Sequence, residues 1–225
     1  MAKKTLLSWS SGKDCAWALH LLRQDPAVEV AGLFTVMNER FDRVSMHGTR
    51  AALLRLQAAA AGLPLQTIDI PDQCPHEEYA ARMQRFIDGA LAAGVESIAF
   101  GDLYLEEVRQ YREDKLRGTG IEPIFPVWGI PTDQLAGQML DAGVEAYVSS
   151  VDLKQLPASC AGRRWSRQLL AELPAGADPC GENGEIHTVV VGGPMFTHPI
   201  PVVVGEVVER SGFAYADLLP AGTEA

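Results

Sequence analysis

Residues 5–15 read TLLSWSSGKDC, and this stretch decides the class of fold. Thr5 to Trp9 is a short apolar run of the length of a buried strand. A polar turn that contains Gly12 follows it, and the amphipathic stretch from Lys13 to Arg23 predicts a helix. A strand that passes through a tight turn into a helix is the opening unit of an α/β fold.

The same alternation of short apolar runs and helical patterns continues to about residue 150. Strands are predicted over residues 28–37, 65–70, 97–100, 123–127 and 145–151, and helices over residues 50–61, 77–93, 101–116 and 132–142. Alternation at this spacing implies right-handed crossovers between parallel strands. The sequence therefore predicts an α/β, Rossmann-like fold, with a mainly parallel sheet and helices on both faces.

The composition changes after about residue 150. Residues 152–179 read as loop and helix, and two β-branched runs over residues 186–191 and 200–208 are separated by Gly192-Gly193-Pro194. We expect a small C-terminal lobe with strand character that closes against the edge of the sheet or its ligand end. The predicted division is residues 1–150, residues 151–220 and a frayed tail, residues 221–225.

Composition and charge limit the location and the partners. The 225 residues are 47% hydrophobic and carry a net charge of −10, which argues against broad binding of nucleic acid. No apolar run approaches the roughly 20 residues that cross a bilayer. The four cysteines form no C-x-x-C pair, so we expect a reduced cytoplasmic setting without membrane attachment.

The turn after the first predicted strand has the features of an anion site. Backbone N–H groups and the positive end of a helix dipole converge there. Gly12 permits close backbone approach, Lys13 adds a positive charge, and hydroxyls come from Ser8, Ser10 and Ser11. A plain turn, with Asp14 capping the helix, is the alternative interpretation. The stretch fits neither the Walker pattern nor the dinucleotide pattern of glycines.

This turn resembles the PP-loop, S-G-G-x-D-S/T, of the ATP pyrophosphatases, which cleave ATP between its α- and β-phosphates. Ser11 stands where the pattern has its first glycine, and Cys15 where it has Ser or Thr. A thiol is a weak hydrogen-bond donor, so Cys15 removes one strong contact. Its place at a helix N-terminus also raises the alternative of a reactive thiol, beside that of a small replacement.

The resemblance extends along the chain in the right order, over roughly residues 5–210. The matching residues are Met37-Asn38-Glu39, His47-Gly48, Gly101-Asp102, Arg109, Arg112, Pro126-Val127-Trp128-Gly129, Gly162-Arg163, the run from Gly181 to Thr188, and Gly193-Pro194-Met195-Phe196. Taken together they resemble the diphthine–ammonia ligase family. The resemblance implies a HUP-type nucleotide-binding fold.

In that family a carboxylate is adenylated by ATP with release of pyrophosphate, and ammonia then displaces AMP to give an amide. The resemblance implies ATP and Mg²⁺ as cofactors, and ammonia and a small-molecule or protein-borne carboxylate as substrates. An amide cannot form from a carboxylate at neutral pH until its oxygen becomes a good leaving group. The loop would hold the β- and γ-phosphates while charge builds on the departing pyrophosphate.

Four residues are predicted to be catalytic: Lys13, Asp14, Glu182 and Glu185. Asp14 would orient Mg²⁺ or simply cap the helix. Glu182 and Glu185 flank a glycine-containing turn, where they would bind ammonium, help to deprotonate it, or hold Mg²⁺. A loop tip with both carboxylates in water is the alternative.

Further residues are assigned to ATP and to the substrate. The backbone of Phe34, Thr35 and Val36 is expected beside adenine, and Gly101 and Asp102 are expected at the nucleotide crevice. The residues predicted to bind substrate are His47, Arg109, Arg112, Gly184 and His187. The two arginines share one helix face, where they would contact phosphate or carboxylate, or face solvent.

Two other functions stay open at this stage. A tRNA-modifying PP-loop enzyme would need catalytic cysteines and a basic surface, which the scattered cysteines and the acidic charge disfavour. A protein that binds ATP or AMP without turnover is kept open by the departures at Ser11 and Cys15. An exposed sheet edge in the small lobe would support a homodimer.

Overall fold

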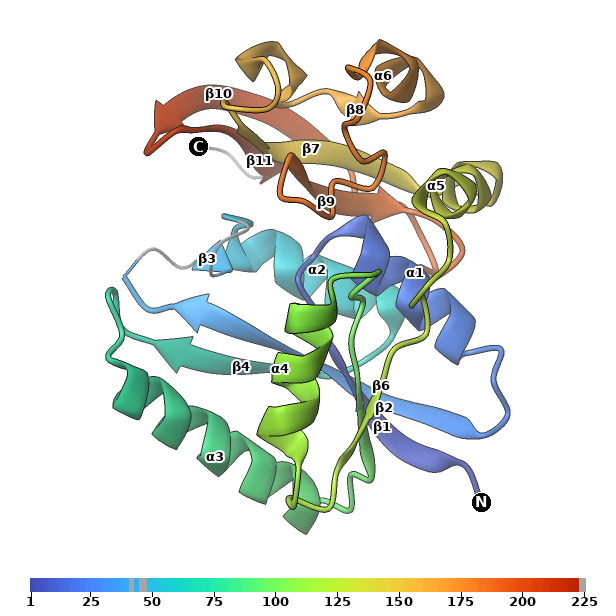
Figure 1. Ribbon diagram of the computed structural model, residues 1–225, viewed down its shortest axis with the longest axis vertical. Coiled ribbons are helices and arrows are strands. Elements are labelled where there is room, and N and C mark those ends of the chain that lie inside the picture. The colour runs from blue at the N-terminus through green and yellow to red at the C-terminus, as the bar shows by residue number, and fades with distance from the viewer. Residues whose placement is uncertain (41–42, 45–47, 223–225) are drawn as a thin grey trace.

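Two β-sheets with helices between and around them make up the chain (Figure 1). The computed structural model describes residues 1–40, 43–44 and 48–222. His47, predicted to bind substrate, lies outside the described residues. None of the described helices is long and apolar enough to cross a membrane.

The first sheet is the predicted parallel sheet. Its parallel strands follow the order β4-β2-β1-β5-β6, and the short β3 pairs antiparallel with β2. Their bounds are β1 (Lys3–Ser8), β2 (Val28–Asn38), β3 (Arg43–Val44), β4 (Leu65–Ile70), β5 (Ser97–Ala99) and β6 (Glu122–Ile124). The α/β fold class is therefore confirmed.

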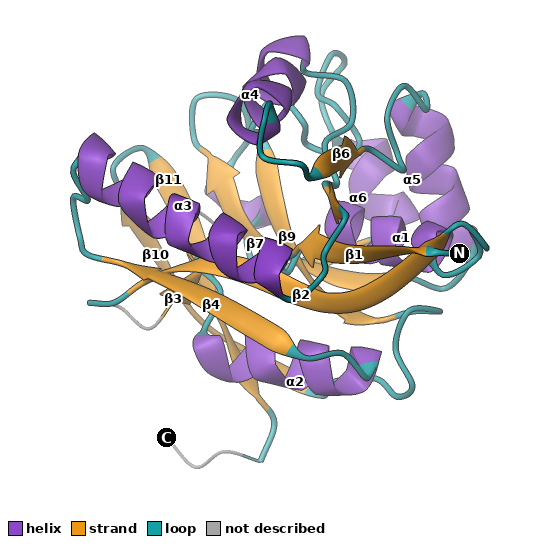
Figure 2. Ribbon diagram, turned by 90° about the horizontal axis from the view of Figure 1, so that it is seen from below, coloured by secondary structure: helices purple, strands orange, loops and turns teal. Residues whose placement is uncertain are grey.

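Helices cover both faces of this sheet, as predicted. On one face lie α1 (Lys13–Leu22) and α2 (Ala51–Ala61), and on the other α3 (His76–Ala92) and α4 (Glu106–Leu116), as Figures 1 and 2 show. Neighbouring residues of β1 face opposite layers, since Leu7 packs in the cluster that contains α1 and Leu6 in the cluster of α3 and α4. A strand buried on both faces appears in the sequence as a continuous apolar run. This is why the opening stretch predicts a sheet that is covered on both faces.

The helix predicted from Gly101 begins later, at Glu106. Residues 101–105 form a loop because their backbone groups bind across to other segments. The Leu103 N–H donates to the Glu182 Oε1 at 2.8 Å, and the Leu103 carbonyl accepts from the Gly129 N–H at 2.8 Å. These long-range bonds replace the local bonds of a helix.

The second sheet is antiparallel and contains a strand that the sequence placed in the first. The predicted strand 145–151 forms as β7, but it pairs antiparallel with β8, β9 and β11. The bounds are β7 (Glu145–Asp152), β8 (Arg164–Trp165), β9 (Ile186–Gly192), β10 (Val202–Arg210) and β11 (Phe213–Pro220). All of its partners come later in the chain, so local alternation could not reveal this pairing, and β11 itself was not predicted.

The second sheet lies over α1 and α2, so these helices are sandwiched between the two sheets (Figure 1). The helix α5 (Thr132–Asp141) leads into β7, while η1 (Ala158–Cys160) and α6 (Arg167–Glu172) follow it. The Val190 N–H of β9 donates to the Ser11 carbonyl at 2.9 Å. The C-terminal sheet therefore touches the turn that follows β1.

Candidate functional site

The carboxyl ends of β1 and β5 flank the point where the strand order reverses. The chain passes from β1 to β2 on one side, and β5 is the neighbour of β1 on the other. Ligands of open α/β sheets bind at such a switch point. A cavity of about 220 Å³, here called the loop cavity, lies there. Its lining comprises Ser8, Ser10, Gly12, Lys13, Asp14, Cys15, Phe100, Gly101, Asp102, Arg112, Cys180, Gly181, Glu182, Ile186, His187 and Thr188.

The turn between β1 and α1 is fixed from outside the cavity. Ser11 has a φ of 77°, a conformation that favours glycine, and it occupies the position where the PP-loop pattern has one. Its hydroxyl hydrogen-bonds to the Thr49 hydroxyl at 2.6 Å, and Ser11 is fully buried. The Ser11 side chain is therefore turned away from the loop cavity, while Ser8, Ser10 and Gly12 line it.

Gln57, which the sequence analysis did not single out, holds this turn in place. Its side-chain N–H groups donate to the carbonyls of Ser11 at 3.0 Å and Val190 at 2.8 Å. Its Oε1 accepts from the Trp9 indole N–H at 2.9 Å. Gln57 is fully buried, so this amide joins β1, the turn, α2 and β9. Gln57 could have been found from the sequence, because a glutamine on the apolar face of an Ala/Leu-rich helix indicates a buried amide that needs hydrogen-bond partners.

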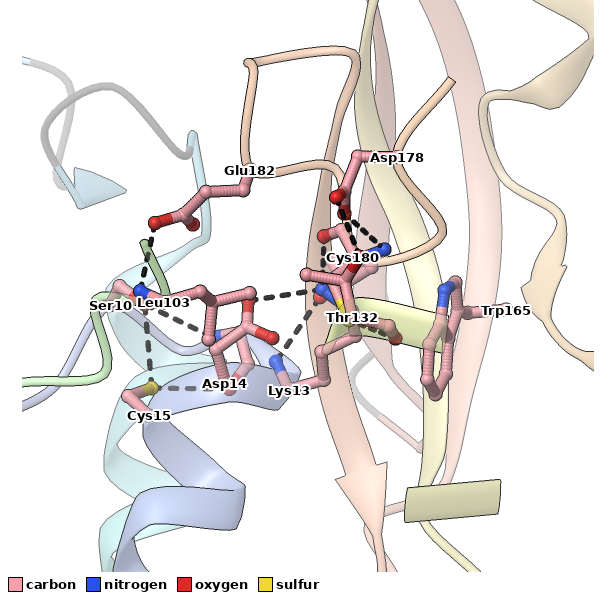
Figure 3. A network of polar contacts seen from close by, with 12 residues as sticks. Ser10, Lys13, Asp14, Cys15, Leu103, Thr132, Trp165, Asp178, Cys180 and Glu182 are labelled. Atoms are coloured by element: carbon pink, nitrogen blue, oxygen red, sulfur yellow. Dashed lines mark hydrogen bonds and ion pairs between the residues drawn. The ribbon is translucent and has the colours of Figure 1, made fainter. Parts of the chain in front are cut away.

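Lys13 is buried and paired with Asp14. The Lys13 ammonium lies 3.0 Å from Asp14 Oδ2, donates to the Cys180 carbonyl, and sits 5.4 Å from the centre of the Trp165 ring (Figure 3). Burial is the largest single influence and opposes the charge on Lys13, but Asp14, Cys180 and Glu182 together outweigh it, so the pKa of Lys13 is raised. Lys13 therefore stays charged and links the start of α1 to the loop before β9.

Asp14 has a carboxylate oxygen that is available to coordinate a magnesium ion. Its Oδ1 is buried and has no hydrogen-bond partner among the described residues. Mg²⁺ is usually held by one or two carboxylates together with substrate phosphates and water, so a dense protein cage is not required. In the part of the chain that the structure describes, three or more His, Cys, Asp or Glu residues nowhere gather to hold a metal by themselves.

The Cys15 thiol is enclosed. Its Sγ accepts from the Ser10 hydroxyl at 3.3 Å and donates to the Gly12 carbonyl at 3.1 Å. Burial raises the pKa of Cys15 to about 11, because it outweighs the hydrogen bonds from Ser10 and Ser11 that lower it. The enclosed position therefore favours the interpretation of Cys15 as a small neutral replacement over that of a reactive thiolate.

The turn around Asn183 separates the two predicted carboxylates. Glu182 lines the loop cavity and accepts from the Leu103 N–H. Glu185 is 2% exposed, and its Oε1 accepts from the Asp178 N–H at 2.9 Å and the Asn183 amide at 3.2 Å. Gly184 lies at the tip of this turn and does not line the cavity. The structure therefore brings Glu182, and not Glu185, to the cavity.

Glu182 is placed to titrate near neutral pH. Burial, and then the carboxylates of Asp14 and Asp102, raise its pKa to about 7, although bonds from the backbone of Leu103 and Tyr104 oppose the rise. His187 lines the same cavity, and burial followed by the charge of Lys13 lowers its pKa. A carboxylate that titrates near pH 7 is suited to accept a proton in catalysis.

Glu182→Gln is expected to stabilise the chain at high pH only. Below the ordinary pKa of 4.5 both folded and unfolded chains carry the protonated acid, and Glu182 makes no difference there. Between 4.5 and about 7 the unfolded chain ionises first, so stability falls as pH rises. We expect a gain of about 1–2 kcal/mol at pH ~8, reduced for partial solvent exposure, and none at pH ~4. Urea unfolding at both pH values measures this, and an equal change at both would contradict the raised pKa.

A second cavity of about 210 Å³, here called the aromatic cavity, adjoins the first. The two share Ser8, Phe100 and Arg112. The other lining residues are Phe34, Val36, Tyr79, Ala80, Met83, Gln84, Phe86, Ile87, Ile98, Tyr111, Lys115 and Leu116. Phe34 and Val36 therefore line it, whereas Thr35 does not. Apart from Arg112, the contributions of α3 and α4, notably Tyr79 and Tyr111, were not predicted.

The two predicted arginines of α4 have different positions. Arg112 lines both cavities, lies 3.4 Å from Asp102 Oδ2 and stacks over Phe100 at 4.9 Å. Arg109 pairs with Glu113 at 2.8 Å and stacks over Phe125 and Trp128, outside both cavities. Arg112 is therefore the cation placed where the two cavities meet.

Family comparison agrees with the architecture. Residues 3–123 match the model of the diphthamide synthase N-terminal domain, and residues 131–217 match that of the diphthamide synthase C-terminal domain. The chain belongs to the diphthamide synthase family. Members of this family are PP-loop enzymes that use ATP. The turn between β1 and α1 has the position and the pattern of that loop and is called the PP-loop below. No curated protein sequence matches it.

The boundary between the two diphthamide synthase domains falls between residues 123 and 131, just before α5. The loop cavity takes its lining from both sides of this boundary. The PP-loop and the loop after β5 come from the N-terminal part, and Cys180, Glu182 and His187 come from the C-terminal part. The site therefore needs both domains of the family.

Proposed function

We propose that the chain binds ATP across the two cavities and uses it to adenylate a carboxylate, which ammonia then converts to an amide. The observation that carries this proposal is the continuity of a polar cavity at the PP-loop with an aromatic cavity beside it. The loop cavity offers backbone N–H groups at the start of α1 for the β- and γ-phosphates. The aromatic cavity offers Phe34, Tyr79 and Tyr111 to the adenine ring.

The reaction would proceed in two steps, adenylation of the carboxylate and attack by ammonia. A carboxylate oxygen attacks the α-phosphorus, the bond between that phosphorus and the bridging oxygen to the β-phosphorus breaks, and pyrophosphate leaves. Ammonia then attacks the acyl carbon, AMP leaves, and one proton is lost from nitrogen. The Lys13 charge and the PP-loop N–H groups favour the first step, since negative charge builds on the pyrophosphate there. Asp14, through its unpartnered Oδ1, is the residue that would hold Mg²⁺, which supplies further positive charge.

Glu182 is proposed to handle the proton of the second step. Its raised pKa lets it exist in both protonation states near neutral pH. The neighbouring carboxylates of Asp14 and Asp102 favour a cation, so the same place would attract ammonium before it loses its proton. Glu185, fixed in the turn by the Asp178 N–H, is proposed to shape the loop that carries Glu182.

The proposal is tested by exchange of labelled pyrophosphate into ATP. Pools of carboxylic acids, small molecules and protein-borne, are supplied without ammonia, and the exchange should depend on the correct acid. Ammonia should then give amide and AMP in equal amounts. Formation of ADP and phosphate would contradict adenylation. Tight binding of ATP, with no formation of AMP in the presence of any of the carboxylic acid pools, would favour a non-catalytic nucleotide-binding protein.

Arg112→Met is expected to weaken ATP binding about 10–100-fold, because a charge-assisted hydrogen bond is worth about 1.5–3 kcal/mol. Arg109→Met is the matched control, since it removes the same charge three residues away, outside both cavities. Its affinity should stay within about twofold of the parent. Calorimetric titration with a non-hydrolysable ATP analogue measures both. Equal losses in the two variants would place the phosphates elsewhere.

A further inference from the structure

β10 presents an apolar edge that pairs with no described strand other than β11. It is the outer strand of the second sheet, where β11 is its pairing partner. Four of its valines are exposed: Val203 at 55%, Val204 at 39%, Val207 at 42% and Val208 at 49%. In the described chain the other exposed large apolar side chains are scattered over several different elements (Met1, Leu56, Leu91, Tyr104 and Tyr111). The valines thus form the one continuous apolar strand edge among them.

Natural proteins protect such edges because the unpaired backbone groups recruit another strand. Charged side chains (lysine above all), an internal proline, a bulge or a very short length are the usual means. β10 reads Val-Val-Val-Gly-Glu-Val-Val-Glu-Arg over nine residues, with no lysine and no proline. Its charged residues and its one irregularity, between Val204 and Val207, leave the four valines exposed. A strand of this length and composition favours a partner strand over open solvent.

The order of the residues indicates which partner. Residues 203–208 read Val-Val-Gly-Glu-Val-Val, so the valines are placed symmetrically about the bond between Gly205 and Glu206. A two-fold axis makes an antiparallel pair of identical strands, in which each residue faces its mirror position. With the axis at this bond, Val203 faces Val208 of a second copy and Val204 faces Val207 of it.

Other antiparallel registers are less favourable. A shift that centres the axis on Glu206 sets two Glu206 carboxylates opposite each other, and like charges in that position destabilise a sheet. A shift that centres it on Gly205 sets Val204 against Glu206. The register centred between Gly205 and Glu206 is the one that pairs all four valines with valines. The strand is therefore complementary to itself.

The ladder between β10 and β11 supports the same axis. Its register shifts between Val204 and Val207, which pair with Leu218 and Ala216. These two partners lie on one face of β11, so Val204 and Val207 also share a face and can pair across an axis that falls between two residues. Gly205 at that point adds no side chain between the two backbones. The regular stretches on either side, which carry the valines, stay available to a second strand.

We propose that β10 pairs with β10 of a second copy of this chain, joining the two C-terminal sheets into one continuous sheet about a two-fold axis. The edge lies on strands separate from the residues that line the loop cavity and the aromatic cavity. Nucleotide binding is therefore expected to proceed in the monomer. The test of the dimer is independent of the test of the proposed reaction.

Sedimentation and mixed cysteine cross-linking test the proposal. In a Cys74→Ser background, since Cys15, Cys160 and Cys180 are buried, Val204→Cys and Val207→Cys chains are prepared separately. A mixture of the two should form disulfide-linked dimers under mild oxidation, because facing Cα atoms of an antiparallel pair lie ~4.5–5.5 Å apart. Each variant alone, and the exposed Leu56→Cys on α2, should cross-link far less.

The parent chain should sediment as a dimer, and Val207→Lys as a folded monomer that still binds ATP. Val207 is 42% exposed, so the lysine should not disturb the fold of one copy. A parent chain that stays monomeric at high concentration would overturn the proposal. So would a dimer in which the mixture cross-links no faster than the single variants, because the interface would then lie elsewhere.

Discussion

Lys13→Met should lower the free energy of unfolding by about 2–4 kcal/mol and abolish formation of AMP. Removing one partner of a buried ion pair leaves the other charge without compensation, at a cost of about 3–5 kcal/mol. The lower range applies here because the Asp14 side chain is 25% exposed, against 2% for Lys13. The same change removes the link from α1 to the Cys180 carbonyl. Urea unfolding and an assay for AMP measure the two effects.

Two further variants separate stability from chemistry. The double variant Lys13→Met/Asp14→Asn leaves no buried charge unpaired, so it should regain most of the lost stability and still make no AMP. Lys3→Met removes the exposed pair with Glu122, which should leave the free energy of unfolding almost unchanged. A double variant as unstable as Lys13→Met would show that the pair does not act as a unit, and normal AMP formation by either Lys13 variant would remove Lys13 from the mechanism.

Gly101→Ala should weaken ATP binding at least ~10-fold and destabilise the chain by about 1–3 kcal/mol. A Cβ at this position would lie 2.8 Å from the Cys15 nitrogen and 3.0 Å from the Asp14 carbonyl carbon. These are backbone atoms at the start of α1, so the loop after β5 and the PP-loop must move apart. The N–H groups that would hold phosphate move with them. Titration with an ATP analogue and thermal unfolding measure the outcome.

Gly89→Ala supplies the matched control. Gly89 lies on the exposed side of α3, and a Cβ there would meet nothing within 4 Å. Alanine favours a helix over glycine by about 1 kcal/mol, so this variant should be slightly more stable and bind ATP normally. If Gly101→Ala also binds ATP normally, the close approach of the β5 loop to α1 is not needed for the site.

The parallel sheet was predictable because its signals are local. Leu6 and Leu7 face opposite layers, and this double burial shows in the sequence as an unbroken apolar run. The assignment of β7 to the first sheet was wrong for the complementary reason. Two of its three antiparallel partners, β9 and β11, lie more than thirty residues further along the chain, and a single strand carries no mark of its partner.

The site was predictable where a residue lies next to the PP-loop in sequence. Ser10, Gly12 and Asp14 line the loop cavity as their position after β1 suggested. Farther along the chain, the resemblance also gave Gly101, Asp102, Glu182 and His187, which line the cavity. It did not give the two residues that bond to the PP-loop from α2 and β9: Gln57, and Thr188, which accepts from the Lys13 N–H at 3.1 Å. Spacing alone could not distinguish Arg112 from Arg109, since the packing of Phe100 and Trp128 decides which one reaches a cavity.

A crystal structure with Mg²⁺ and α,β-methylene-ATP, which resists cleavage between those phosphates, would locate the nucleotide. We expect the β- and γ-phosphates against the backbone of residues 10–15, the metal at Asp14, and the base among Phe34, Tyr79 and Tyr111. Density for the analogue at another place, with the loop cavity filled by protein side chains, would contradict it.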